Sequence, residues 1–296
     1  MGCNAPQEKQ HCSDFGTSTL RASLNSAAMC PFADFPADAL KGLTGVFTDI
    51  DDTLTTEGAI TPDALQALGE LKAAGLSVVA ITGRPVGWSL PFATAWPVDA
   101  IVAENGAVAL QGGPATRPAH NVDLQKHYLQ NEDVRQANFT RMQAVAARVL
   151  RDVPGATLAQ DSPGRETDIA IDHSEFVQLS PERIAQVVSI MQSEGMNATV
   201  SSIHINGWFG THNKWVGARW ITRQLWGRDL QSEIGRWLYV GDSTNDQRMF
   251  EAFTHSVGVA NIRRFEDQLT HKPGYITLSE RGAGFAEVAR AVLAAR

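Results

Sequence analysis

The sequence predicts an α/β protein with a Rossmann-like parallel-sheet core and an inserted smaller α/β cap domain. Three short apolar runs, bounded by polar or turn residues, lead to this prediction: residues 46–48, 76–81 and 237–240. Runs of this kind are typical of strands buried on both faces of a parallel sheet. Residues 113–206, which mix helical and alternating patterns, separate the second run from the third and predict the inserted domain.

The predicted core comprises residues 41–112 and 207–296. Its first helix is expected to start at Thr61 and to end near Gly75. A strand, a helix and a second strand in succession imply a right-handed parallel crossover. A further strand is expected over residues 100–103. Three leucines of the helix recur at helical spacing and are expected to face the sheet: Leu65, Leu68 and Leu71.

The inserted segment predicts a small α/β domain with one solvated sheet face. A helix is expected over residues 133–151, because apolar residues recur there every three or four positions. Residues 167–172 alternate like a half-buried strand, and alternation returns over residues 198–205. Ser180 is the expected N-cap of a helix that ends near Gly195. The recurring apolar residues of the first helix are Phe139, Met142, Val145, Ala146 and Val149.

Residues 1–40 form the third predicted region, a disordered or extended N-terminal segment. The first part of it is polar and aperiodic, and Met29 is an alternative start. All three cysteines lie here: Cys3, Cys12 and Cys30. Disulfides and thiol chemistry are therefore not expected in the two predicted domains.

Composition and charge exclude several classes of function. The chain has 296 residues, 43% of them apolar, which suffices for a large and a smaller core. The net charge of −7 gives no basic footprint, so a nucleic-acid partner is not expected. No apolar run approaches the roughly 18 residues of a membrane span or forms a secretory leader. We therefore expect a cytoplasmic protein without a membrane partner, and no obligate protein partner is evident.

Carboxylates follow the first predicted strand directly. Asp49 and Asp51 are two residues apart, at the sheet edge where open α/β folds bind ligands. Like charges this close shift each other's pKa, so such a cluster normally carries a cation, a shared proton or a reaction. A solvated acidic loop is the alternative interpretation.

Other polar groups follow in a definite order. Thr82 and Gly83 come directly after the second strand. Asn213 is a plausible N-cap for a helix that opens with Lys214. The third strand runs into the polar segment 241–246, which contains a second pair of carboxylates.

This order resembles the four-motif signature of the haloacid dehalogenase (HAD) superfamily of phosphatases and phosphotransferases. Asp49, Asp51 and Thr53 match its Asp-x-Asp-x-Thr motif, and residues 241–246 match its Gly-Asp-Ser-x-Asn-Asp motif. The joint occurrence of the motifs is specific, whereas a single lysine or a single Thr-Gly pair is not.

The spacing of the motifs resembles one subclass of this superfamily. The interval between Thr82 and Lys214 is long, whereas that between Asp51 and Thr82 is short. This resembles the type II (subclass IIB) capped members, among them Cof-type hydrolases and sugar-phosphate phosphatases. Two positions depart from the usual pattern, since Asp52 stands where glycine is common and Trp215 follows the lysine.

The resemblance implies a Mg²⁺-dependent phosphatase that hydrolyses a small phosphorylated metabolite, such as a sugar phosphate, through an aspartyl-phosphate. Asp49 would be the nucleophile and Asp51 the acid/base. Thr82, Gly83 and Lys214 would bind the phosphoryl oxygens. The implied Mg²⁺ ligands are Asp49, the backbone carbonyl of Asp51, Asp242 and, through water, Asp246.

Charge chemistry independently favours this set. A transferring phosphoryl group carries spread negative charge, so its catalysis is mainly positioning and electrostatic stabilisation. Mg²⁺ prefers oxygen ligands and cancels the repulsion between a carboxylate and a phosphate. Two other functions stay open on the residues alone: a phosphomannomutase-like phosphotransferase, and a non-catalytic metal- and phosphate-binding module.

Several further residues have two interpretations each. The candidates for substrate contacts are Arg84, Glu104, Asn105, Asn213 and Asn245. The first could bind a phosphate bidentately or complete a turn, and Glu104 and Asn105 could contact substrate, contact a hinge or only form a turn. Four tryptophans could form a sugar-stacking platform or pack in the core: Trp88, Trp208, Trp215 and Trp220. His204 and His212 lack the spacing of a zinc site.

Overall fold

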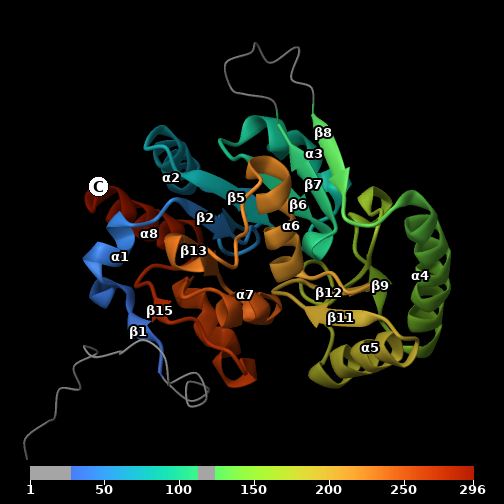
Figure 1. The fold of residues 1–296 in the computed structure, drawn as a ribbon. Helices are drawn as coiled ribbons and strands as arrows, with labels where there is room; N and C mark the ends of the chain where they lie inside the picture. Colours follow the sequence, from blue (N-terminus) through green and yellow to red (C-terminus); the bar gives the residue numbers. More distant parts are fainter. Residues whose placement is uncertain (1–27, 113–123) are drawn as a thin grey trace, which may run out of the picture.

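The computed structural model describes residues 28–112 and 124–296 (Figure 1). The expectations for residues 1–27, including Cys3 and Cys12, lie outside the described residues. The same is true of residues 113–123, where the predicted cap was expected to begin.

Nine strands of the described residues form one large sheet in the order β1-β15-β14-β13-β2-β5-β6-β7-β8. The strands from β1 to β6 in this order are parallel, and β7 and β8 are antiparallel additions at one edge. The three apolar runs are central neighbours in it. The strands are β1 (Cys30–Pro31), β2 (Gly45–Thr48), β5 (Ser77–Ile81), β6 (Ala100–Ala103), β7 (Val108–Gln111), β8 (Gln125–Tyr128), β13 (Trp237–Gly241), β14 (His255–Gly258) and β15 (Tyr275–Ile276).

Helices cover both faces of the large sheet, which explains why its central strands are apolar throughout. One face packs against α1 (Ala37–Lys41), α2 (Pro62–Ala73), α3 (Val86–Ala95) and α8 (Arg281–Ala294). The other packs against α6 (Lys214–Trp226) and α7 (Gln247–Ala252). This architecture confirms the predicted α/β fold class.

A separate four-stranded antiparallel sheet lies beside the large one, in the order β11-β12-β10-β9. Two helices, α4 (Glu132–Asp152) and α5 (Pro181–Ser193), pack on its outer face (Figure 1). The strands are β9 (Thr157–Leu158), β10 (Ile169–Asp172), β11 (Asn197–Val200) and β12 (His204–Trp208). We call residues 132–208 the lid; β8, although it lies within residues 113–206, belongs to the large sheet.

The two central strands of the lid sheet, β10 and β12, are not solvated on either face, contrary to the expectation. Strand β10 is buried at all four positions, and its neighbour β12 is buried at all five. The alternating polar residues of these strands, among them Asp172, His204 and Asn206, are buried as well. The pattern arises because the inner face of the lid sheet lies against polar groups of the core rather than against water.

Residues 30–40 of the expected disordered or extended N-terminal segment contain the strand β1 and most of α1. Strand β1 pairs with β15, and Phe32, Phe35 and Leu40 are buried. Buried apolar side chains therefore anchor this segment to the core. Their spacing has neither helical nor strand periodicity, so a search for periodic apolar residues does not find them.

Two helices and one strand also differ in detail from the prediction. Leu65 is 37% exposed and Phe139 is 40% exposed, because each lies at the margin of its helix's apolar face. The alternation over residues 198–205 is two strands, β11 and β12, separated by a turn. Ser201 forms this turn, since its hydroxyl accepts hydrogen bonds from the backbone N–H groups of Ile203 and His204.

Among the described residues, 28–112 and 124–296, no helix has both the length and the apolar character required to cross a membrane.

Candidate active site

The carboxyl edge of the large sheet collects the predicted polar residues. Strands β13, β2 and β5 are parallel neighbours, so the segments that follow them lie side by side. The backbone N–H of Asp49 donates to the Val240 carbonyl across this edge at 2.9 Å. Residues far apart in sequence therefore meet at one place, as Asp49 and Asp242 do.

Lys214 is the centre of the charged cluster. Its Nζ lies 2.6 Å from Asp49 Oδ1, 2.7 Å from Asp246 Oδ1 and 3.3 Å from Asn245 Oδ1. The side chain is buried, and burial alone would lower the pKa of its ammonium. The charges of Asp246 and Asp49 outweigh burial and raise the pKa of Lys214, so the residue stays cationic.

The start of α6 fixes where Lys214 lies. Asn213 is its N-cap, and its Oδ1 accepts from the backbone N–H of Val216 at 3.0 Å. The cap prediction is confirmed, whereas a substrate contact by Asn213 stays a prediction. A Cβ on Gly217 would lie 2.5 Å from the Gly106 Cα, so glycine is required where α6 meets η3 (Glu104–Gly106).

Three buried carboxylates form a candidate cation site. Oxygen atoms of Asp49, Asp242 and Asp246 lie within 4.8 Å of one another. Burial raises the pKa of Asp49 to about 8, with Lys214 opposing and Asp246 adding to the shift. Burial and neighbouring carboxylates also raise the pKa of Asp242. Such repulsion is what a bound cation relieves.

The donor set fits a hard divalent cation. Asp242 Oδ1 is buried without a hydrogen-bond partner, whereas Oδ2 accepts from Asn261 Nδ2 at 3.1 Å. A buried carboxylate oxygen without a hydrogen-bond partner costs free energy unless a cation binds to it. The ligands would all be oxygen atoms, which is the preference of Mg²⁺.

Arg84 connects the core to the lid. Its Nε donates to both carboxylate oxygens of Asp51, at 2.9 and 3.1 Å. Its Nη1 and Nη2 lie 3.2 Å from Asp161 Oδ2 and 2.8 Å from Glu175 Oε1, both in the lid. Its backbone N–H donates to Thr82 Oγ1 at 3.0 Å, which agrees with the turn interpretation of Arg84, whereas its binding of a phosphate stays a prediction.

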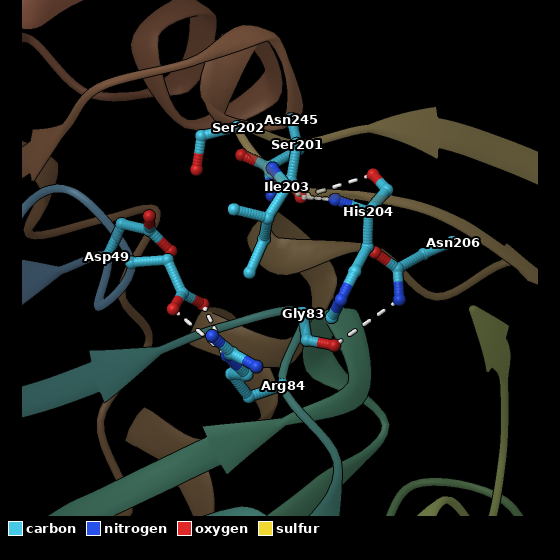
Figure 2. Close-up of a pocket in the computed structure, with 10 residues that line it drawn as sticks. Asp49, Gly83, Arg84, Ser201, Ser202, Ile203, His204, Asn206 and Asn245 are labelled. Atoms are coloured by element: carbon cyan, nitrogen blue, oxygen red, sulfur yellow. Dashed lines mark hydrogen bonds and ion pairs between the residues drawn. The ribbon is translucent and has the colours of Figure 1, made fainter. Parts of the chain in front are cut away.

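A small cavity lies between Asp49, Asp51 and the lid. Figure 2 shows the Ile203 side chain pointing into it, beside polar groups of the same turn. His204 Nε2 lies 2.8 Å from Glu175 Oε2, the carboxylate that also contacts Arg84. The lining residues are Asp49, Asp51, Gly83, Arg84, Ser201, Ser202, Ile203, His204, Asn206 and Asn245.

Glu104 and Asn105 lie at the junction between core and lid, not in the cavity wall. The Glu104 carboxyl accepts hydrogen bonds from the backbone N–H groups of Val86 and of two lid residues, Glu166 and Thr167. Asn105 Nδ2 lies 3.4 Å from Asp168 Oδ2. Of the interpretations left open for this segment, the structure therefore favours the contact at the hinge.

The four tryptophans do not line the cavity. Trp208 is buried and stacks on His212, and Trp215 packs against Phe253. Trp220 lies beside the core cluster, and Trp88 lies 5.1 Å from the Arg84 guanidinium. Packing is therefore their role here.

The only group of potential metal ligands found among the described residues is the three aspartates, without a histidine.

Sequence reasoning missed the lid's contribution to the site. Asp161, Glu175 and Arg165 reach the Gly83–Arg84 turn, with Arg165 Nη1 donating to the Gly83 carbonyl at 3.0 Å. The buried, alternating polar residues of β10 and β12 are the signal that could have pointed to a polar junction. Their partners, however, are too distant in sequence to be identified from it.

Comparisons with known proteins agree with this geometry. The family model of haloacid dehalogenase-like hydrolases matches residues 46–143. No curated protein is significantly similar to the chain in sequence.

Solved structures share the fold at low identity. A Thermoplasma acidophilum protein has a TM-score of 0.62 at 14% identity, covering 84% of this chain and 98% of its own. A Plasmodium vivax protein described as HAD/COF-like has a TM-score of 0.62 at 16% identity, with coverages of 88% and 99%. The sucrose-phosphatase of Synechocystis has a TM-score of 0.59 at 15% identity, with coverages of 84% and 98%. The chain is therefore similar to the haloacid dehalogenase-like hydrolases over residues 46–143, and it shares the fold of these solved structures over most of its length.

Proposed function

We propose that this protein is a Mg²⁺-dependent phosphatase that hydrolyses a small phosphorylated metabolite, of which sugar phosphates are the favoured class. One arrangement carries the proposal. The buried ammonium of Lys214 contacts Asp49, the candidate nucleophile, and the neighbouring Asp242 has a carboxylate oxygen without a hydrogen-bond partner, which a cation could occupy. Positive charge on both sides of a carboxylate is what attack on an anionic phosphoryl group requires.

Asp49 and Asp51 have complementary tasks in this proposal. An Asp49 oxygen attacks phosphorus while the bond to the leaving oxygen breaks, and Asp51 gives that oxygen its proton. Asp51 then takes a proton from water, whose oxygen attacks phosphorus and releases Asp49. Burial raises the pKa of Asp51 despite the neighbouring Arg84, which suits a carboxyl that must carry a proton.

Lys214, Thr82 and Gly83 would hold the phosphoryl oxygens during both steps. Asp49, Asp242 and the Asp51 carbonyl would hold Mg²⁺, with Asp246 beside them. The bound cation would supply charge neutralisation between carboxylate and phosphate. Because the lid residues close over the cavity, they would also exclude bulk water from the reacting groups.

The favoured substrate class follows from the cavity lining. Residues with neutral polar side chains line the cavity, among them Ser202, Asn206 and Asn245, and the Arg84 nitrogens are already paired with carboxylates. Such a lining suits a neutral polyhydroxyl group. Two proteins of the same fold are named as a sucrose-phosphatase and a subclass IIB sugar phosphatase.

Phosphate release from a panel of sugar phosphates and other phosphoesters tests the proposal, with Mg²⁺ or with a chelator. Release should require the cation and should fall by at least a thousandfold in Asp49→Asn, because the amide cannot attack phosphorus. Asp133→Asn, at an exposed position of α4, is the matched control and should retain full activity. Mg²⁺ binding without hydrolysis of any member of the panel would refute the phosphatase.

A further inference from the structure

Tyr239 is a buried tyrosine in the third core strand, β13, and its hydroxyl reaches the charged cluster. The residue is fully buried among Phe250 and Phe253, and its Oη donates a short hydrogen bond to Asp246 Oδ1. Tyr239 and Gly241 point to the same face of the strand, since side chains alternate. A Cβ on Gly241 would lie 2.5 Å from Asp246 Oδ2 and 3.0 Å from Tyr239 Cε1, so glycine leaves the space in which this contact forms.

The acceptor positions of Asp246 are all occupied by protein donors. Oδ1 accepts from Tyr239 and from Lys214 Nζ, and Oδ2 accepts from the backbone N–H groups of Asp242 at 2.9 Å and Ser243 at 3.1 Å. A carboxylate offers about four acceptor sites, so none is left for direct coordination of a cation. Asp242, with its orphaned Oδ1, is the contrasting case.

We infer that Tyr239 is a positioning residue, which holds Asp246 as the anchor of Lys214 rather than as a direct ligand of the cation. The inference rests on the proposed function. Tyr239 and Lys214 share one oxygen, so the phenol fixes the carboxylate from the core side and the ammonium meets it from the site side. Lys214 is thereby kept within reach of Asp49 and of a phosphoryl oxygen. Without the phenol, Asp246 keeps its two backbone donors on Oδ2, but Oδ1 is held by the ammonium alone and can shift, taking Lys214 with it.

The variant Tyr239→Phe tests this assignment because it keeps the ring and removes only the hydroxyl. We expect KM for the best substrate and Kd for inorganic phosphate, measured by calorimetry with Mg²⁺ present, to rise about tenfold, the usual effect of losing a hydrogen bond to a charged group. We expect Kd for Mg²⁺ alone to change less than twofold. Tyr128→Phe is the matched control, since its hydroxyl also donates to a carboxylate, Glu166 Oε2 at 2.6 Å, outside the cavity.

A purely structural tyrosine would give a different result. It would lower the melting temperature of Tyr239→Phe while leaving KM and phosphate binding within twofold of wild type, and this would overturn the inference. A loss of Mg²⁺ affinity larger than the loss of phosphate affinity would overturn it as well, because Asp246 would then act as a ligand of the cation.

A second variant covers the case in which Tyr239→Phe does not fold. Asp246→Asn should weaken phosphate binding about tenfold with Mg²⁺ affinity within about threefold of wild type; the reverse order would overturn the inference. The binding measurements also separate the two proposals. A wild-type protein that binds both ions and hydrolyses nothing refutes the phosphatase alone, whereas an active enzyme indifferent to Tyr239→Phe refutes the positioning role alone.

Discussion

Lys214 balances the charge of the candidate site. Its ammonium separates Asp49 from Asp246, both buried, and each carboxylate lies within 2.7 Å of it. A buried ion pair seldom adds much net stability, but removing one partner leaves the other without compensation. The residue is therefore important for folding as well as for the proposed binding of a phosphoryl group.

Replacing Lys214 by methionine, which has a similar length, should lower the free energy of unfolding by about 3 kcal/mol without Mg²⁺, because two buried carboxylates lose their counter-charge. Saturating Mg²⁺ should restore part of this loss. Chemical denaturation with and without the cation measures both effects. The matched control is Lys72→Met, whose ion pair with Asp99 is partly exposed and should cost at most about 1 kcal/mol. An equal cost for the two variants would contradict the argument.

At the residue scale, the strand-end residues could be predicted because each lies in a short local motif. Asp49, Asp242 and Lys214 occur at the carboxyl edge, as the sequence order indicated. Glu175 could not be predicted, because its partner Arg84 lies 91 residues away in the chain. Nor could Tyr239, since a tyrosine in an apolar strand signals only that its hydroxyl needs some partner.

The same distinction holds for whole elements. Helices α5 and α6 begin where predicted, because an N-cap is a local signal: Ser180 and Asn213 both accept from a backbone N–H three residues later. The turn between β11 and β12 was missed although two consecutive serines, Ser201 and Ser202, shift the phase of the alternation there. The complete burial of the central lid strands β10 and β12 was missed because it depends on the core that faces them.

The connection between β12 and α6 contains a histidine that is neutral in the fold. His212 is buried and stacked on Trp208, and neither of its ring nitrogens has a hydrogen-bond partner. Burial lowers the pKa of His212 to about 4, from the ordinary value of 6.5 for a histidine. Between these two pH values the unfolded chain binds more protons than the folded one. Stability must therefore fall as the pH falls from 6.5 towards 4.

The variant His212→Phe tests this linkage, because phenylalanine keeps a flat ring against Trp208 and cannot be protonated. Between pH 6.5 and pH 4.5, the free energy of unfolding should fall by about 1–3 kcal/mol less in His212→Phe than in wild type. Urea denaturation at both pH values provides the measurement. His271→Gln, at a partly exposed position, serves as the control. An unchanged pH dependence in His212→Phe would show that the imidazole is protonated in the folded state.

On the scale of the whole molecule, the lid and the core are joined by buried polar contacts rather than by an apolar interface. Arg84 meets Asp161 and Glu175, Arg165 meets the Gly83 carbonyl, and Glu104 accepts from the lid backbone. Such contacts are strong only while every partner is present and water is excluded. A junction of this composition suits a lid that opens to admit a substrate and closes again.

Glu175 is the residue on which this junction can be tested. Burial by itself would raise the pKa of its carboxyl, but hydrogen bonds from His204 and Arg84 lower it to about 2, so Glu175 is ionised whenever the protein is folded near neutral pH. Glu175→Gln keeps the shape and removes the charge that both partners require. We expect the lid to open more often, with amide hydrogen exchange at least tenfold faster in residues 201–206 and in the Gly83–Arg84 turn. Glu194→Gln is the matched control, because Glu194 pairs with Arg148 inside the lid and contributes nothing to the junction. Equal exchange in wild type and Glu175→Gln would mean that the remaining contacts of Arg165 and Glu104 alone hold the lid closed.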